Sequence, residues 1–586
     1  MIENTYIFQC SKDNVNNSQE IFKNCYLKNS FSSASQVIIH EEDENFRIDA
    51  FGHFYFSNSK NIYPYSDSNH LLKDLSISNP IEFLNSIAGG LYSIWILDKK
   101  NNKLYASTEN FGATALYWKA TETSILLSNN QFALNSECNF DEMSSFEFLI
   151  YGYLPLSDSL FALTKRLQPN KLIMIDLKTI KLMLVDKKSF AYLAPKNRYS
   201  NQDEILEKMQ KAFQEYFERI MNLDSFFGLS GGYDSRLIAA YLKNTNSHAI
   251  HYMNSDLLER KAASLTAKLS NLPLQMEIFP EEAPTLYHDN MRYQYLSISS
   301  FEYSHVLHLQ ENAKLSNAKF YVDGYIGDTI FGGTYFEAKR KNIFYLLKYL
   351  FFQESKDEPL PEDIHEWNKI ISDREILDYS KMDFLPKDSI KNHIELKTKE
   401  VLGSIKENIY TKEDLMEKWK HVTRARCMIS MGPTGINLFM PACVPFLDNK
   451  ILEICLNTTK NLRSMDRLYN LFWKKYFLEY AKIAKARTGS YAIYGNFVFR
   501  LHHIFNTLYK KFYEFFFSTK DRYIDTKSYV FSDKNSALWM NLRSDLSKLP
   551  LSIREYIEKS DFNSLVKDER FFLRLMSLCN YARKTE

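Results

Sequence analysis

The pattern of apolar and polar positions changes at about residue 200 of this 586-residue chain. Upstream, short apolar runs alternate with turns, and strand-like runs lie at 45–57, 89–97, 103–107 and 124–128. Residues 71–85 have helical spacing. A mostly β order with few helices predicts an α+β layered domain.

Downstream of residue 200, strand and helix patterns alternate. An amphipathic helix is predicted at 205–221, and the strand-like runs and helical patterns that follow it lie at 226–229, 237–242, 248–253, 261–269 and 275–278. Such alternation predicts an α/β domain with a doubly wound parallel sheet, which binds ligands at the carboxyl ends of its strands.

Beyond residue 336 the pattern is largely helical, interrupted by a charged, Pro-containing loop at 353–363. Residues 499–517 have apolar positions at helical spacing, which predicts a helix packed on the preceding domain; a docking face for a peptide or a membrane surface is the alternative. We therefore predict three parts: residues 1–195, residues 200–495, and a helical C-terminal extension at 496–586.

The stretch at 226–236, FFGLSGGYDSR, lies where a predicted strand turns into a helix. Its small residues let backbone N–H groups approach an anion closely at a helix start. Asp234 offers a carboxylate for a Mg²⁺ ion that bridges phosphates. The candidate nucleotide-binding residues of this loop are Ser230, Gly231, Gly232, Asp234 and Ser235. A Walker loop would need a Lys that is missing here, and a ligand-free Gly-rich turn is the alternative.

The form Ser-Gly-Gly-x-Asp-Ser resembles the pyrophosphate-binding loop of ATP pyrophosphatases, which cleave ATP to AMP and pyrophosphate. Together with residues 321–333 and the segment Val444–Asp448, it resembles the asparagine synthetase family. Within that family the chain is most similar to the glutaminase-inactive β-lactam synthetases and lasso-peptide macrolactam synthetases. The resemblance spreads over most of residues 1–490. It implies an Ntn-hydrolase-like first domain and an ATP-pyrophosphatase domain after it.

Residues 321–333 resemble the second acidic stretch of the family. The resemblance places Asp328 at the second Mg²⁺ carboxylate, with a turn residue as the alternative, and places Asp323 and Gly324 at the nucleotide. Thr329 stands where the family usually has a Glu. β-Lactam synthetases also lack that Glu, and they use a Tyr in the position of Tyr325 to deprotonate the attacking amine. Tyr325 is therefore a candidate catalytic residue, with packing as the alternative.

Residues 485–489 resemble a family segment whose Lys contacts phosphate and stabilises the intermediate. Arg487 falls at the Lys position, and Lys485 is the second candidate. An Arg can hold a phosphate through two parallel hydrogen bonds, but its pKa cannot shift as that of Lys can. Solvated surface charge is the alternative for both residues.

The first domain resembles a glutaminase that has lost its chemistry. The family exposes a Cys at its mature N-terminus, whereas Met1 is followed here by Ile2, and release of Cys10 would remove the predicted first strand. The Asn that would polarise the oxyanion is replaced by Phe51, although Asp67 survives. The resemblance therefore implies a scaffold without glutaminase activity.

The composition of the chain argues against some classes of partner and site. A net charge of +2 gives no electrostatic case for a nucleic-acid partner. The 7 Cys form no Cys-x-x-Cys pair, so neither a disulfide framework nor a zinc site is indicated. The N-terminus lacks a secretory signal, and no apolar run is long enough to span a bilayer. We therefore expect a cytoplasmic protein without a membrane span.

These features predict an asparagine synthase-like, AMP-forming ligase that uses ATP and Mg²⁺. The enzyme would adenylate a small-molecule or peptide carboxylate and transfer it to an amine that its own first domain does not supply. An intramolecular amine would give a macrolactam, with a precursor peptide and its peptidase as partners. The alternatives are asparagine synthesis from free ammonia, and an impaired pseudo-synthetase that acts as a binding protein.

Overall fold

The structure is a computed structural model, and part of the chain is described. The described residues are 6–11, 19–29, 38–57, 59, 62–64, 70–135, 138–188, 193–252, 257–278, 305–332, 385–405, 409–486, 489–495, 498, 501–502, 505, 546–560 and 569–583.

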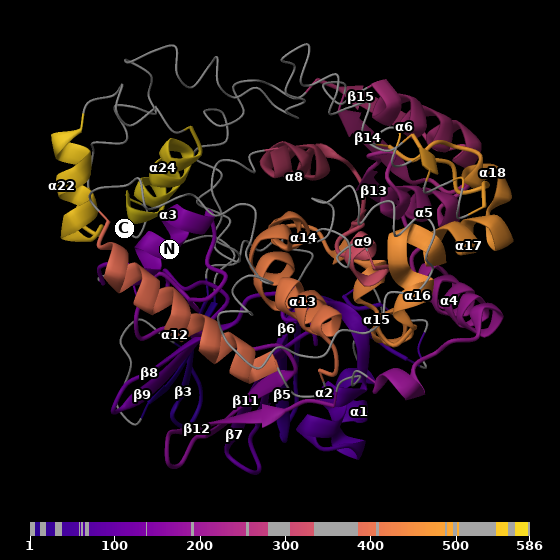
Figure 1. The fold of residues 1–586 in the computed structure, drawn as a ribbon. Helices are drawn as coiled ribbons and strands as arrows, with labels where there is room; N and C mark the ends of the chain where they lie inside the picture. The colour runs from indigo at the N-terminus through magenta and orange to yellow at the C-terminus, as the bar shows by residue number, and fades with distance from the viewer. Residues whose placement is uncertain are drawn as a thin grey trace.

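Two six-stranded antiparallel sheets form the N-terminal part of the molecule (Figure 1). The first sheet has the order β10 (Lys165–Arg166), β8 (Tyr117–Ala120), β9 (Ser124–Ser128), β1 (Tyr6–Ser11), β3 (Cys25–Asn29), β2 (Gln19–Phe22). The second has the order β12 (Lys181–Asp186), β11 (Lys171–Asp176), β7 (Lys103–Thr108), β6 (Ile87–Asp98), β5 (Phe46–Phe56), β4 (Ile38–Glu42). Apolar side chains from both sheets, such as Phe8 and Trp95, stack between them at 5.3 Å.

The helical pattern predicted at 71–85 forms two helices, α1 (His70–Ile77) and α2 (Pro80–Ser86). Pro80 has no N–H to donate to a preceding turn, so it begins a new helix. The side chain of Asn79 caps that helix by accepting a hydrogen bond from the backbone N–H of Glu82 at 2.9 Å. A third helix, α3 (Glu142–Tyr151), follows β9 of the first sheet and precedes β10.

A five-stranded sheet of parallel strands forms the second part of the molecule. Its order is β15 (Leu274–Glu277), β14 (His248–Tyr252), β13 (Ser225–Gly228), β16 (Phe320–Val322), β17 (Ala442–Cys443). The chain runs outward from β13 to one edge, returns, and then runs outward from β16 to the other edge. This order is that of a doubly wound sheet, and its switch point lies between β13 and β16.

Helices surround the parallel sheet and continue beyond it (Figure 1). They are α4 (Gln202–Phe217), α5 (Tyr233–Tyr241), α6 (Leu257–Ser270), α8 (His305–Leu315), α9 (Gly327–Ile330), α13 (Lys412–Lys420), a π-helix (His421–Ile429), α14 (Met431–Ile436), α15 (Asn449–Leu456), α16 (Lys460–Arg463), α17 (Arg467–Tyr476) and α18 (Leu478–Ala481). The predicted fold class is confirmed: a layered α+β part precedes a doubly wound α/β part, and further helices follow. Within the described ranges, no helix has both the length and the apolar character needed to cross a membrane.

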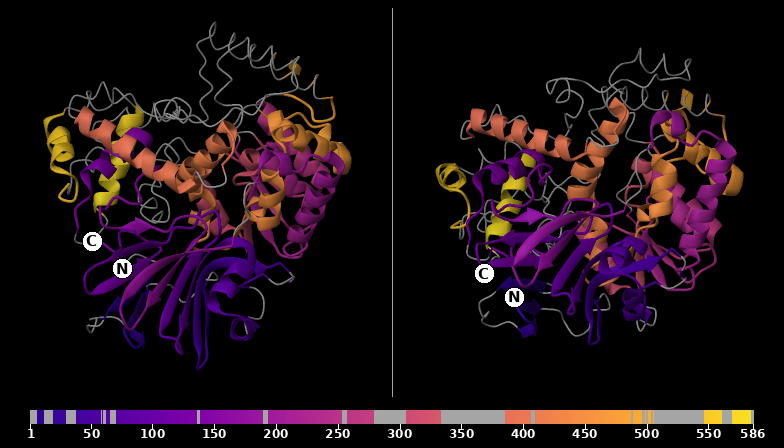
Figure 2. Two further views of the ribbon diagram at one scale, coloured as in Figure 1. Left: turned by 60° about the horizontal axis from the view of Figure 1, so that its bottom comes forward. Right: turned by 90° about the horizontal axis from the view of Figure 1, so that it is seen from below.

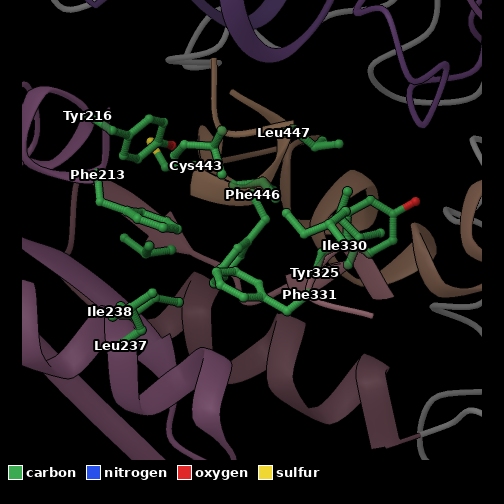
Figure 3. Packing of buried hydrophobic residues seen from close by; sticks show 14 of the residues in the cluster. Phe213, Tyr216, Leu237, Ile238, Tyr325, Ile330, Phe331, Cys443, Phe446 and Leu447 are labelled. Atoms are coloured by element: carbon green, nitrogen blue, oxygen red, sulfur yellow. The ribbon is translucent and has the colours of Figure 1, made fainter. Parts of the chain in front are cut away.

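The two parts share one hydrophobic core. Apolar residues of the layered part, including Tyr55 and Leu91, belong to the same buried cluster as the strands of the parallel sheet. The rings of Phe446, Phe213 and Phe331 pack against one another in this cluster, and the Phe446 centroid lies 5.7 Å from that of Phe213 and 6.3 Å from that of Phe331 (Figure 3). The layered part is therefore packed directly against the elements that carry the switch point.

The described C-terminal helices pack on the layered part. Helices α12 (Lys387–Ile405), α22 (Leu551–Lys559) and α24 (Glu569–Arg583) lie near α3 (Figure 2). Apolar side chains of all four helices form one buried cluster. The buried Arg574 donates hydrogen bonds to the carbonyls of Leu149 and Ile150 at the end of α3. Most of the helix predicted at 499–517 lies outside the described residues, and the three predicted boundaries stay predictions.

A stability prediction follows from His53, which is fully buried in β5 with no hydrogen bond to either ring nitrogen. Burial lowers the pKa of His53 to about 3, so the folded state binds fewer protons than the unfolded state between that value and about 6.5. Stability is therefore lost as the pH falls through this window. We expect His53→Leu to remove about 2 kcal/mol of the stability lost between about pH 7 and pH 5. Urea unfolding of both proteins at both pH values measures this, and an equal loss in both would refute it.

Candidate functional site

The switch point brings together the two carboxylates that sequence patterns predict to hold Mg²⁺. Asp234 lies in the first turn of α5, after β13, and Asp328 lies in α9, after β16. The backbone N–H of Asp328 donates to Asp234 Oδ2 at 3.1 Å. Burial and then the negative charge of Asp328 raise the pKa of Asp234 above its ordinary value. The two acidic residues are therefore brought together, which makes them a candidate pair of cation ligands.

Two glycines allow this approach. A Cβ at Gly327 would lie 2.5 Å from Cγ and from Oδ1 of Asp234, and a Cβ at Gly324 would lie 3.0 Å from Asp234 Cβ. Any side chain at Gly327 would therefore push the second acidic segment away from the first. Gly324 is a predicted nucleotide contact, and in the structure it lies against Asp234.

The conformation of the loop after β13 is held by contacts among its own residues and with its immediate neighbours. Gly231 has a φ of +71°, and a Cβ there would also lie 2.8 Å from the carbonyl oxygen of Glu259. The hydroxyl of Ser235, which is 6% exposed, accepts a hydrogen bond from the N–H of Ser230 at 3.1 Å. The N–H of Gly232 lies 3.4 Å from Ser230 Oγ. The Ser235 side chain thus stabilises the conformation of the loop. The contact of these residues with a nucleotide stays a prediction.

Arg236 fixes this loop to a distant segment, and sequence patterns did not identify it. Its side chain is fully buried and donates to the Gly231 carbonyl at 3.0 Å. The same guanidinium donates to the carbonyls of Ile483 at 2.9 Å and Ala484 at 2.7 Å. The loop after β13 and the segment that carries Lys485 are therefore held by one side chain.

Lys485 lies beside the first acidic residue. Its Nζ is 2.6 Å from Asp466 Oδ2 and 4.7 Å from the centroid of the Tyr233 ring. The positive charge of Lys485 acts to lower the pKa of Asp234, against the larger effect of burial. Arg487, the first candidate for a phosphate contact, lies outside the described residues. Of the two candidates, Lys485 is the one that the described structure places at the switch point.

Asp323 follows β16 and is half-buried at the carboxyl edge of the sheet. Its Oδ1 accepts a hydrogen bond from the N–H of Tyr325 at 2.7 Å. Burial raises the pKa of Asp323 to about 6. Its Oδ2 lies 4.0 Å from the position that a Cβ on Gly432 would take, so α14 begins close to this carboxylate.

Tyr325 is buried, with 3% of its surface exposed. Its hydroxyl donates to the carbonyl of Ala425 in the π-helix at 2.7 Å, and it points away from Phe446 (Figure 3). Burial, followed by the charge of Glu109, raises the pKa of Tyr325 well above its ordinary value. This geometry gives no support to a role as a base, which stays a prediction.

The second acidic segment is anchored by a buried ion pair. The Arg463 side chain pairs with Glu417, and neither is exposed. Arg463 also donates from Nε to the carbonyl of Ile330, the last residue of α9, at 3.0 Å. Thr329, where the family has a Glu, donates its hydroxyl to the Ile326 carbonyl at 2.7 Å. These contacts fix the short helix that carries Asp328.

Cys10 and Phe51, which are the described residues at the predicted glutaminase positions, are both buried in the layered part. Cys10 is fully buried opposite Cys25 on β3, and contact with the Cys25 thiol and burial raise the pKa of Cys10 well above its ordinary value. A thiol of that kind is a poor nucleophile. Phe51 is 1% exposed and belongs to the core between the sheets. Asp67 lies outside the described residues.

The donor set fits Mg²⁺ in the form in which it binds nucleotides. Among the described residues, no group of three or more His, Cys, Asp and Glu could enclose a metal ion. Asp234 and Asp328 alone offer two carboxylates, and Mg²⁺ is commonly held by one or two carboxylates together with substrate phosphates and water. The loop at 230–232 lies next to Asp234, where such phosphates would bind.

Comparisons with known proteins do not identify a family. No protein-family model and no curated protein matches the chain. Among solved structures, the chain is similar to glutamine phosphoribosylpyrophosphate amidotransferase from B. subtilis in complex with ADP and GMP, at 10% identity over 67% of this chain and 82% of that one, with a TM-score of 0.20. It is also similar to the U34-tRNA thiolase NcsA from Methanococcus maripaludis, at 14% identity over 40% of this chain and 85% of that one, with a TM-score of 0.19. TM-scores this low carry no weight, and the fold class rests on the strand orders of the three sheets.

We expect Arg236→Met to lower the free energy of unfolding by about 3 kcal/mol, because it leaves several buried carbonyls without a donor. Arg219→Met is the matched control, since Arg219 also donates to backbone carbonyls, of Ser59 and Glu215, but is half-exposed. We expect Arg219→Met to lower the free energy of unfolding by about 1 kcal/mol. Urea unfolding of both variants measures these losses. Equal losses in the two variants would show that burial of the Arg236 contacts is not decisive.

Proposed function

We propose that this protein is an ATP-dependent ligase that adenylates a carboxylate, releases pyrophosphate, and transfers the acyl group to an amine. The observation that carries the proposal is the approach of Asp234 and Asp328 from neighbouring strands at the switch point. Ligands of doubly wound sheets bind at this point. The motif after β13 adds the small residues that an anion requires.

Each part of the site has a role in this proposal. The loop at 230–232 would bind phosphate through backbone N–H groups, and Arg236 fixes the shape of that loop. Asp234 and Asp328 would hold Mg²⁺, which supplies charge compensation for the departing pyrophosphate. Lys485, half-buried beside Tyr233 and paired with Asp466, would place a positive charge next to the phosphates.

The amine would come from outside the layered part. Buried Cys10 and core Phe51 support the absence of glutaminase chemistry there. The acceptor is then an amine of another molecule or of the substrate itself. Attack by the substrate's own amine would form a macrolactam, in line with the resemblance to lasso-peptide macrolactam synthetases. Free ammonia, with asparagine as the product, is the alternative acceptor.

We expect Asp234→Asn to abolish Mg²⁺-dependent binding of the α,β-methylene analogue of ATP, because it removes one of two anionic ligands. With substrate, turnover should fall by about a thousandfold. Calorimetric titration with and without Mg²⁺ measures the binding. Asp224→Asn is the control, since Asp224 is exposed, immediately precedes β13, and should bind as the wild type does. Near-normal Mg²⁺-dependent binding of the analogue by Asp234→Asn would contradict the proposed function.

We also expect no ammonia release from L-glutamine by the intact protein. The reason is that the Cys10 thiol is buried and hydrogen-bonded, so no thiolate is presented to an amide. A coupled assay for free ammonia measures this, with the same glutamine solution incubated without the protein as the control. Sustained release that disappears in Cys10→Ser would contradict the scaffold role of the layered part.

A further inference from the structure

Asp234 has a hydrogen-bond partner that the resemblance does not assign. The hydroxyl of Tyr469, in α17, donates to Asp234 Oδ1 at 2.5 Å. The N–H of Asp328 donates to the other oxygen, Oδ2, at 3.1 Å. Both oxygens of this carboxylate therefore accept a hydrogen bond from the protein, and the two donors come from different segments of the chain.

Tyr469 is itself held rigidly. It is 1% exposed, and its ring stacks on that of Phe331 with centroids 3.7 Å apart and an interplanar angle of 7°. Phe331 directly follows α9, which carries Asp328. The tyrosine thus connects both acidic segments, through a hydrogen bond to one and a ring contact with the other.

We propose that Tyr469 is a positioning residue that fixes the orientation of the Asp234 carboxylate for Mg²⁺-nucleotide binding. This inference rests on the proposed function. Mg²⁺ demands near-ideal octahedral geometry, so a carboxylate free to rotate binds it less well than one held in place. With Gly327 against one side of the carboxylate and Tyr469 bonded to Oδ1, rotation about the Cβ–Cγ bond of Asp234 is blocked. Each oxygen keeps a second lone pair, which remains open to a cation.

The competing explanation is that the Tyr469 hydroxyl stabilises the fold and has no effect on Asp234. The neighbouring Tyr233 serves as a control that distinguishes this explanation from the positioning role. Tyr233 is 3% exposed, and its ring centroid lies 5.4 Å from that of Tyr469. Its hydroxyl also donates a hydrogen bond, but to Asn470 Oδ1 at 2.9 Å rather than to a carboxylate. Loss of either hydroxyl removes one buried hydrogen bond, and only the loss from Tyr469 changes the surroundings of Asp234.

The test is calorimetric titration of wild type, Tyr469→Phe and Tyr233→Phe with the α,β-methylene analogue of ATP, in Mg²⁺ and in EDTA. We expect Tyr469→Phe to weaken binding in Mg²⁺ by about tenfold or more, because a hydrogen bond to a charged group is lost. Binding in EDTA should change little. Tyr233→Phe should bind as the wild type does in both conditions. Phe331→Leu, which removes the stacking partner of Tyr469, should shift binding in the same direction by a smaller factor.

The outcomes are distinguishable. Two results would overturn the positioning role alone. One is an affinity of Tyr469→Phe for the analogue equal to that of Tyr233→Phe. The other is a loss of affinity in Tyr469→Phe that has the same size in Mg²⁺ and in EDTA. If neither the wild type nor Tyr233→Phe binds the analogue in a Mg²⁺-dependent way, the proposed function is wrong, and this inference is wrong with it. Thermal unfolding of the three variants checks that a selective loss in Mg²⁺ is not a loss of folded protein.

Discussion

Repulsion between two carboxylates is the constraint on which the rest of this structure depends. Asp234 and Asp328 lie on loops that leave neighbouring strands, and the negative charge of Asp328 adds to the effect of burial in raising the pKa of Asp234. The surrounding contacts prevent the two loops from separating. Arg236 holds the first loop from behind, and Arg463, paired with Glu417, holds the end of the helix that carries Asp328. Both buried arginines therefore hold the backbone of the two acidic segments through its carbonyl oxygens.

This arrangement also explains the use of glycine. At Gly327 and Gly324 the chain comes so close to Asp234 that a Cβ would collide with it or press on it. At Gly332, with a φ of +95°, a Cβ would lie 2.6 Å from the carbonyl oxygen of Arg463. The second acidic segment thus has small residues on the side that meets Asp234 and on the side that meets its anchor. Close approach at these points, more than freedom in the unfolded chain, accounts for these residues.

The sequence was sufficient for features that depend on local pattern and order. The predicted strand at 45–57 agrees with β5, and the alternation after residue 200 predicted the doubly wound sheet. The proximity of Asp234 and Asp328 follows from that order, since loops at the carboxyl ends of neighbouring strands meet. Strand β12 was not among the predicted ranges, because most of its side chains are exposed or half-exposed on both faces and its alternation is weak.

Features that depend on distant pairing were out of reach of the sequence. Tyr469 is 235 residues from its partner Asp234, and the contact of Arg236 with Ala484 spans 248 residues. A buried Tyr in an amphipathic helix and an Arg in an apolar one have no pattern that predicts a partner. The same holds for Tyr325, since its sequence position resembles that of a base whereas its hydroxyl binds a carbonyl of the π-helix. Motif position predicts which backbone reaches the site, and tertiary packing decides where each side chain points.

The same packing gives the layered part a structural role toward the part that carries the parallel sheet. Tyr55 of β5 is fully buried and donates its hydroxyl to Asp448 at 2.7 Å, and Asp448 caps α15 after the Val444–Asp448 segment. Asn437 donates to the carbonyl of Leu91 at 3.0 Å and accepts from the N–H of Ala442, in the edge strand β17. None of these contacts uses the positions of Cys10 or Phe51. Removal of the layered part would therefore leave buried polar groups and part of the shared core exposed to water.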